Sequence, residues 1–201
     1  YKNLDKFINQ ANLPLIKDYM KFHLLSGSAS YLSKDLDAKR FDFYGKFLRG
    51  QQEQRAQNKR AFELINGSLG EAFGKLYVEK FFPASAKSQM VELIDYLKKS
   101  FAQHINNLAW MSNTTKEKAL NKLNKFTVKV AYPDQWKDYS KLTILSEKDG
   151  GTLYKNLQNI TAWQYQKDLA KIGKPVDKAE WGMTPQTVNA YYNPLNNEIV
   201  F

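Results

Sequence analysis

The feature that most constrains the fold is a helical repeat of apolar residues within the stretch 51–83. Its apolar positions recur at spacings of three and four: Phe62, Ile65, Leu69, Phe73, Leu76 and Tyr77. This period places them on one face of an α-helix, and such a face must be buried against another element. Gly67, Gly70 and Gly74 lie in the same stretch, although each glycine costs a helix about 1 kcal/mol relative to alanine. We therefore expect a second helix to approach closely here, and Pro83 to end the first.

Similar patterns predict helices along most of the remaining chain. The expected helices cover 3–10, 13–31 with Leu15, Tyr19, Phe22 and possible burial of His23, a segment ending at Gly50, a segment starting at Ser85, a segment capped by Ser112 or Asn113, and a segment from Thr152 to Gly173. Alternating residues predict a short strand at 127–133 and a hairpin in which TVNAYY and NEIVF flank the turn residues NPLNN. The expected fold class is mainly α, with β structure concentrated at the C-terminal end.

Composition excludes several classes of protein. Apolar residues make up 43% of the chain, which is enough for a packed core. The net charge is +10, but the basic residues are spread singly, so we expect no nucleic-acid partner. The absence of cysteine excludes disulfides, thiolate zinc sites and cysteine nucleophiles.

No apolar run is long enough to span a bilayer, no signal peptide is recognised, and the chain does not begin with Met. We expect a piece of a longer protein, whose membrane association would require a segment outside this chain.

Motifs for metal binding or nucleophilic catalysis are missing from the sequence. His23 and His104 each lack a second His at the spacing of a zinc helix such as H-E-x-x-H. The glycine-rich GSLGEAFG does not have the spacing of a phosphate-binding loop, and it lies in a stretch with helical period. We therefore predict no catalytic residue and no metal ligand within these 201 residues.

The C-terminal stretch VNAYYNPLNNEIVF, residues 188–201, contains the one candidate binding feature. Asn189 occupies a strand position that would ordinarily hold an apolar or β-branched residue. Its side-chain amide could hold the backbone of an extended peptide that adds to the sheet edge. It could equally satisfy a neighbouring loop, and the residues by themselves leave both interpretations open.

The same stretch resembles the substrate-strand segment of the neprilysin and endothelin-converting-enzyme family of zinc metallopeptidases. GEAFGKLYVEKFFP resembles the family's segment before its catalytic half. AWMSNTTKEKALNKLNKF, followed by the Y-P-D-x-W residues of AYPDQWKDY, resembles two further family motifs in the same order. The resemblance covers nearly the whole chain, and it is strongest at 41–145 and 181–201.

The resemblance implies two largely helical domains that enclose a cavity. Residues 1–148 would then belong to the domain that covers the active site, and residues 149–201 would begin the catalytic domain. By position in the family motif, Asn189 would bind the substrate backbone through its side chain, Ala190 would add a main-chain contact, and the ring of Tyr191 would help to line the pocket. The expected partners are oligopeptide substrates and the remainder of the catalytic domain.

The family's zinc ligands and general base lie in motifs that follow the hairpin and do not occur in this sequence. We therefore expect a zinc-dependent endopeptidase as the parent protein, and no zinc binding or hydrolysis by the 201 residues themselves. The lack of cysteine, unlike the disulfide-rich animal members, indicates a bacterial member. The resemblance also implies a location outside the cytoplasm.

Two alternatives remain beside the peptidase interpretation. One is a helical binding module whose basic surface meets an acidic partner, and the other is a peptidase-derived scaffold without catalysis. We further hypothesise that residues 187–201, as a hairpin without a pairing partner, pair with another molecule or pack irregularly on the helices.

Overall fold

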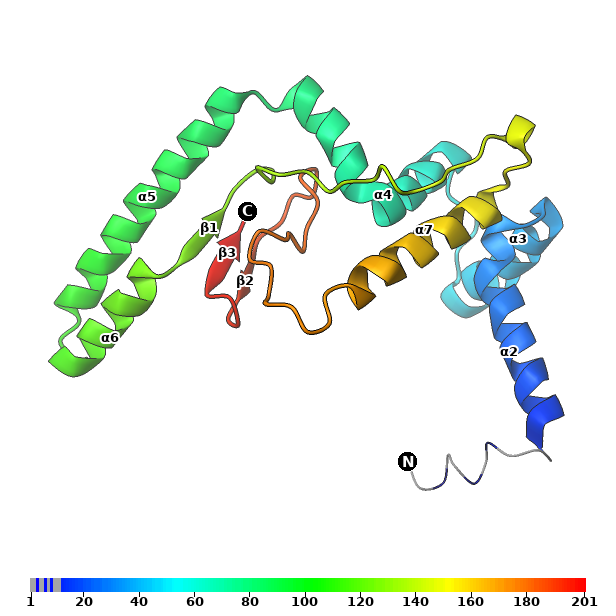
Figure 1. Cartoon of the computed structure of the whole chain (residues 1–201), viewed down its shortest axis with the longest axis horizontal. Coiled ribbons are helices and arrows are strands. Elements are labelled where there is room, and N and C mark those ends of the chain that lie inside the picture. The colour runs from blue at the N-terminus through cyan, green and yellow to red at the C-terminus, as the bar shows by residue number, and fades with distance from the viewer. Residues whose placement is uncertain (1–2, 4–5, 7, 9–11) are drawn as a thin grey trace. The chain divides into compact units, whose positions relative to one another are not determined.

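A computed structural model describes residues 3, 6, 8 and 12–201 of the chain, shown in Figure 1. The predicted helix at 3–10 therefore lies mostly outside the described residues. The chain forms two compact units, which are described separately. The first contains residues 1–61 and 142–168, and the second contains residues 62–141 and 169–201. The predicted domain boundary between residues 148 and 149 stays a prediction.

The first unit is helical. Its elements are α2 (Leu13–Ser28), the 3₁₀ turn η2 (Ala29–Tyr31), α3 (Lys34–Arg40), the π-helical segment η3 (Phe41–Phe47), the 3₁₀ turn η4 (Glu147–Asp149) and α7 (Leu153–Leu169), whose last residue lies in the second unit. The Ser33 hydroxyl caps α3 by accepting a hydrogen bond from the Leu36 amide at 3.4 Å. Gly50 follows η3 with a φ of +67°, so the prediction that this glycine ends the helical segment is confirmed.

Helix α2 differs from its prediction in one respect. Leu15, Tyr19 and Phe22 were expected near its buried side, but their residues are 60%, 64% and 63% exposed, and His23 is exposed as well. None of the 16 residues of α2 is buried against the described part of the chain. The periodicity correctly predicts the helix, but it does not identify what covers its apolar residues.

The second unit contains most of α4 (Gln57–Phe81), followed by α5 (Ala84–Asn107) and α6 (Asn113–Asn124), which folds back beside α5 (Figure 1). Helix α4 has a kink at Leu69, whose φ of −128° and ψ of 34° are not helical. Pro83 separates α4 from α5, and the Ser112 hydroxyl caps α6 by accepting from the Thr115 amide at 3.3 Å. Both predicted boundaries are thus confirmed.

The glycines of α4 also correct a prediction. Gly70 and Gly74 are buried, as close approach by another element requires. However, a loop contacts them rather than a second helix: their nearest neighbours are side chains of Thr184, Pro185 and Gln186. Because glycine has no Cβ, buried glycines indicate only that another element comes close. A tight turn fits such a surface as well as a helix does.

A small sheet forms the β structure of the second unit. Its strands β1 (Thr127–Lys129), β2 (Tyr191–Asn193) and β3 (Glu198–Val200) lie in the order β1-β3-β2 (Figure 1). β2 and β3 form the predicted hairpin, and β1 pairs with β3 in parallel, with Val128 opposite Ile199. The hypothesis that residues 187–201 lack a regular partner within the chain is therefore wrong, because β1 provides one.

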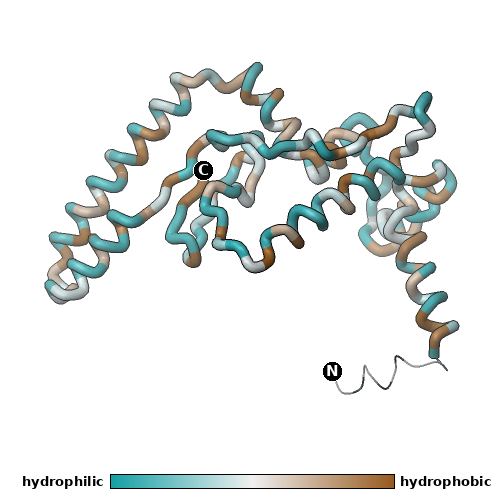
Figure 2. Tube along the Cα trace, viewed as in Figure 1, coloured by the Kyte–Doolittle hydropathy of each residue, from teal (hydrophilic) through white to brown (hydrophobic). Residues whose placement is uncertain are grey.

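The predicted fold class is confirmed as mainly helical with a C-terminal hairpin. Burial among the described residues is concentrated at few positions: Ala29, Ile94, Ile105, Val130 and Val200 are the buried hydrophobic residues, joined by Lys129 and Glu198. Hydrophobic positions recur along α5 between hydrophilic ones in Figure 2, and several of them, including Leu97 and Phe101, stay more than half exposed. The sheet is thus the best-packed part of the second unit.

Candidate peptide-binding edge

The predicted site residues lie together at the start of the outer strand of the sheet. β2 pairs with β3 on one side, and no other described strand pairs with it on the opposite side. Asn189 and Ala190 immediately precede β2 and are exposed, whereas Tyr191 is its first residue and is half-buried opposite Val200. The strand is shorter than predicted, because residues 187–190 are irregular rather than paired. An edge of this kind can accept a further strand.

Asn189 makes local hydrogen bonds that use one of the two polar atoms of its side-chain amide. Its backbone N–H donates to the Thr187 carbonyl at 3.1 Å, and its Oδ1 accepts from the Ala190 N–H at 2.8 Å. This arrangement is typical of an asparagine that shapes its own turn. No hydrogen bond from its Nδ2 is found in the part of the chain that the structure describes. The side chain therefore fits the local interpretation through its oxygen, while its two N–H donors remain available to a ligand.

Tyr191 is fixed by its hydroxyl group. The backbone N–H of Gly182 donates to Tyr191 Oη at 3.0 Å, which ties β2 to the segment that follows α7. A Cβ on Gly182 would lie 3.1 Å from the same oxygen, so a larger residue there would require the end of the Tyr191 side chain to move by a few tenths of an ångström. The role of the ring in lining a substrate pocket stays a prediction.

A buried ion pair joins β1 to the middle strand β3, behind the edge strand β2. Lys129 on β1 and Glu198 on β3 are 8% and 2% exposed, and Lys129 Nζ lies 2.8 Å from Glu198 Oε2. Lys129 Nζ also donates to the Glu180 carbonyl at 2.7 Å. The Asn193 and Asn196 amides donate to Glu198 Oε1, each at 3.4 Å. Buried charges persist only when they are paired in this way.

The environment of Glu198 sets its protonation. Burial by itself raises the pKa of this carboxyl group. The hydrogen bonds from Lys129 and Asn196, the charge of Lys129 and the hydrogen bond from Asn193 together outweigh burial, so the pKa of Glu198 lies below its ordinary value. The group is therefore ionised at neutral pH and holds β3 between its neighbours.

The hairpin turn is fastened to α6. Asn197 adopts a left-handed conformation with a φ of +49°, and its Nδ2 donates to the Lys122 carbonyl at 2.9 Å. Its Oδ1 accepts from the Tyr192 hydroxyl at 3.1 Å, while the Tyr192 ring stacks on Phe126 with centroids 5.8 Å apart. Asparagine tolerates this conformation better than most residues do. The NPLNN residues were correctly predicted as a turn, but their attachment to α6 was not.

Comparisons with known proteins agree with this architecture. The model of peptidase family M13 matches residues 1–133. The chain belongs to this family. It is 35% identical to the neutral endopeptidase of Lactobacillus helveticus over 198 residues, which cover 98% of this chain and 30% of that protein. It is also 29% identical to Neprilysin-11 of Caenorhabditis elegans, in an alignment that covers 100% of this chain and 24% of that protein.

Solved structures of M13-like enzymes give the same result. The zinc metalloprotease Zmp1 of Mycobacterium tuberculosis in its open state matches with a TM-score of 0.87 and 44% identity over 99% of this chain and 30% of that one. PepO from Lactobacillus rhamnosis matches with a TM-score of 0.82 and 30% identity over 98% and 31%. The predicted neprilysin-like and bacterial character is confirmed. The chain spans less than a third of the length of these relatives.

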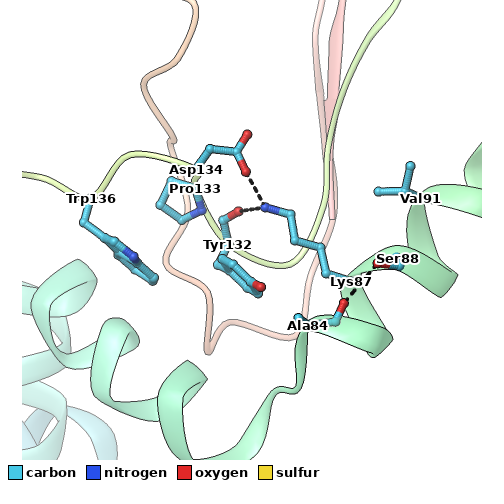
Figure 3. A pocket seen from close by; sticks show the side chains of 8 residues that line it. All are labelled: Ala84, Lys87, Ser88, Val91, Tyr132, Pro133, Asp134 and Trp136. Carbon is cyan, nitrogen blue, oxygen red and sulfur yellow. Dashed lines mark hydrogen bonds and ion pairs between the residues drawn. The ribbon is translucent and has the colours of Figure 1, made fainter.

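The M13 chain also has a cavity that was not predicted from the sequence. It measures about 530 Å³ and lies between the start of α5 and the segment after β1, with the lining residues shown in Figure 3. Lys87 points into it and donates to the Tyr132 carbonyl at 2.9 Å and to Asp134 Oδ1 at 2.7 Å. The Lys87 ammonium also lies 4.2 Å from the centre of the Tyr132 ring. These contacts make Lys87 a structural clamp on the Y-P-D-x-W segment.

The described residues of this M13 chain do not fit a zinc ion. No group of three or more His, Asp or Glu side chains is arranged to hold a metal within residues 3, 6, 8 and 12–201. His23 and His104 are both exposed, and they belong to different units. No step of zinc chemistry can therefore be derived from these residues. Among the described helices, none is both long and apolar enough to cross a bilayer.

Sequence reasoning missed several residues that shape the edge. Lys129 and Glu198 escaped notice because each charge, taken singly, resembles an ordinary surface residue. The strand alternation that buries Val200 also places Glu198 on the buried side, and this signal could have found it. Gln186 gave no signal, because its partners lie more than a hundred residues earlier in the chain.

Proposed function

We propose that this chain contributes the covering domain and the substrate-binding strand of a longer M13 zinc metalloendopeptidase that cleaves oligopeptides in an enclosed cavity. Residues 1–148 would belong to the cover and residues 149–201 would begin the catalytic domain. The observation that carries the proposal is the exposed edge at Asn189 and Ala190, held in place by a well-packed sheet. Membership of the M13 family and the similarity to neutral endopeptidases support it.

The edge would act by strand addition. An extended peptide laid beside β2 would donate a main-chain hydrogen bond to the Ala190 carbonyl, because the Ala190 N–H is already bonded to Asn189 Oδ1, and the Asn189 Nδ2 donors would bind a peptide carbonyl. Main-chain hydrogen bonds are independent of sequence, so this edge would hold many different peptides and leave specificity to side-chain pockets. Such contacts orient the peptide relative to the reacting groups, and correct orientation is itself a large part of catalysis.

Zinc, the general base and the oxyanion-stabilising group would come from parts of the parent protein outside these residues. When bound there, zinc would polarise the scissile carbonyl and activate water. This chain would contribute binding and orientation, and the isolated 201 residues would hydrolyse no peptide. The family resemblance further supports a location outside the cytoplasm for the parent.

The decisive experiment compares Asn189→Ala with Asn121→Ala in the full-length gene product. Asn121 is an exposed asparagine on α6, remote in sequence from the edge, and serves as a matched control. We expect Asn189→Ala to lower kcat/KM for a quenched fluorescent oligopeptide about tenfold, the equivalent of one lost hydrogen bond of about 1.4 kcal/mol. The control should keep the wild-type value. Equal rates for both variants would remove Asn189 from the substrate site.

A second measurement tests the division of labour. The full-length product should lose activity when zinc is chelated, whereas the 201-residue chain should show no turnover with or without zinc. Zinc-dependent cleavage by the 201 residues would refute this part of the proposal. Salt-sensitive binding to nucleic acid or anionic lipid, with no peptidase activity in the full-length product, would favour the alternative of a basic binding module.

A further inference from the structure

A tight turn immediately precedes the proposed peptide-binding edge. The Thr187 N–H donates to the Thr184 carbonyl at 3.0 Å, and the two threonine hydroxyls lie 2.8 Å apart. Pro185 occupies the second position of this four-residue turn, where its fixed φ is favourable. Gln186 occupies the third position. The turn thus directs the side chains of Pro185 and Gln186 toward α4.

The surface that receives the turn is the glycine face of α4. Gly70 and Gly74 are four residues apart, so they lie above one another on the same side of the helix. A Cβ on Gly70 would lie 2.6 Å from Thr184 Cγ2, and one on Gly74 would lie 2.5 Å from Gln186 Oε1 and 2.8 Å from Pro185 Cδ. By contrast, a Cβ on Gly67 would meet nothing within 4 Å. The two buried glycines are therefore specific to this contact.

The Gln186 side chain fastens the turn to the helix. Its Nε2 donates to Asn66 Oδ1 at 2.5 Å and to the Gly70 carbonyl at 2.9 Å, so both of its N–H donors are used. Its Oε1 is buried, with no hydrogen-bond partner among the described residues. The two donated hydrogen bonds and the contact with the glycines hold the turn on α4 and offset the free-energy cost of burying this oxygen without a partner. The Gly70 carbonyl lies beside the helix kink at Leu69.

We propose that Gln186 is a positioning residue for the peptide-binding edge: by fastening the Thr184–Thr187 turn to the glycine face of α4, it sets where Asn189 and Ala190 present themselves to the substrate. Asn189 follows three residues after Gln186, and its N–H bonds the carbonyl of Thr187, the last residue of the turn. A shift of the turn is therefore passed directly to Asn189. This inference rests on the proposed function and adds to it the part that orients the strand.

A merely structural role for Gln186 would make a different prediction from a positioning role. If Gln186 only stabilised the fold, its loss would lower the free energy of unfolding but act on catalysis independently of Asn189. If it acts through Asn189, the two residues are coupled, and removing one should largely cancel the effect of removing the other. A double-mutant cycle on kcat/KM separates the two cases.

The test uses the full-length gene product with Gln186→Met, Asn189→Ala and the double variant. Met keeps the length of the side chain but loses both donated hydrogen bonds. We expect Gln186→Met to lower kcat/KM about fivefold in the native background, mainly through KM, and less than about twofold beside Asn189→Ala. Additive effects would overturn the proposal. If the Met variant does not fold, the neutral and shorter Gln186→Leu, which also lacks the N–H donors, takes its place in the same cycle.

A matched glycine pair provides an independent test of the same contact. Gly74→Ala places a methyl group against Gln186 and Pro185, whereas Gly67→Ala adds the same group to the same helix in open space. We expect Gly74→Ala to shift the backbone amide NMR signals of residues 187–191 and to raise KM, and Gly67→Ala to do neither. If both variants leave those signals and KM unchanged, the inference fails. Failure of Asn189→Ala to affect activity would instead refute the proposed function.

Discussion

Strand β3 and helix α2 were both predicted from periodic apolar residues, and the two have opposite environments. Val200 of β3 has no exposed surface and Glu198 beside it is 2% exposed. Helix α2 has no residue buried against the described part of the chain, and Leu24 in its second half is 62% exposed. The strand is three residues long and the helix 16. Length of a regular element is therefore no guide to how firmly this chain holds it.

The difference lies in where the partner of each apolar face is found. β3 is covered within the chain because β1 and β2 pair with both of its edges. The apolar side chains of α2 have no comparable cover in the described residues. A periodic apolar face indicates that a helix needs a cover, but it does not place that cover in any particular part of the sequence. Four substitutions or conditions test this contrast.

The largest effect is expected from Lys129→Met. This change leaves Glu198 buried without its counter-ion, which costs about 3–5 kcal/mol of unfolding free energy. Urea denaturation followed by circular dichroism measures the loss. Lys171→Met is the matched control, because Lys171 forms a 2.6 Å ion pair with Glu180 while both side chains stay substantially exposed, and it should cost less than about 1 kcal/mol. Similar losses for the two lysines would show that burial of the Lys129 pair is unimportant.

Val200→Ala is expected to have the next largest effect. Removing two methyl groups from a fully buried valine costs about 2 kcal/mol, through lost burial and the cavity left behind. Val176→Ala makes the same chemical change at a residue that is 72% exposed, and should stay within about 0.5 kcal/mol of the native chain. The comparison would break down if the exposed valine proved as sensitive as the buried one.

Acid should weaken the sheet through Glu198. Its pKa is lowered in the folded chain, so the unfolded chain binds a proton more readily, and the stabilisation is complete above the ordinary carboxyl pKa. The stabilisation is lost as the pH falls below about 4 toward the lowered pKa. Unfolding free energies at neutral and acid pH measure this loss. Glu198→Gln should reduce the difference between the two conditions, and an unchanged difference would assign the acid sensitivity to other carboxyl groups.

The smallest effect is expected in α2. Leu24→Ala should change the unfolding free energy of the 201-residue chain by less than about 0.5 kcal/mol, because the side chain is already exposed to water and alanine favours helix. In the full-length gene product, the same change should cost more than about 1 kcal/mol if another part of that protein covers α2. A large loss in the 201-residue chain would mean that Leu24 is buried in solution.

Local signals were enough to predict much of the helical architecture. Ser112 was one of two predicted caps, with Asn113, because a hydroxyl before a helical pattern has a well-defined partner one turn later. Gly50 marked a boundary because glycine readily adopts a positive φ, and Pro83 because its ring cannot continue a helix. The signals at Ser112, Gly50 and Pro83 each act within a few residues along the chain, so no knowledge of the rest of the fold was needed.

Signals that depend on distant residues were harder to interpret. Gly70 and Gly74 correctly indicated a close approach, but the approaching element, the turn around Gln186, could not be named from α4 itself. β1 was expected as a strand, yet nothing in its sequence identified β3 as its partner. Asn189 was identified as a candidate edge residue from the strand pattern, and family resemblance added its role in substrate binding, while its hydrogen bond to Ala190 emerged only from the structure.

The parallel pairing of β1 with β3 has a consequence for biosynthesis. Thr127 must wait for Glu198 to leave the ribosome before it can pair, and at about 5–20 residues per second this delay lasts several seconds. During that time β1 is an unpaired strand in a crowded cell. In the folded sheet Lys129 is paired with Glu198 and buried, and we expect its charge to be exposed before Glu198 arrives and to discourage pairing with foreign strands. The same lysine would then discourage wrong pairing in the nascent chain and balance the charge of Glu198 in the folded sheet.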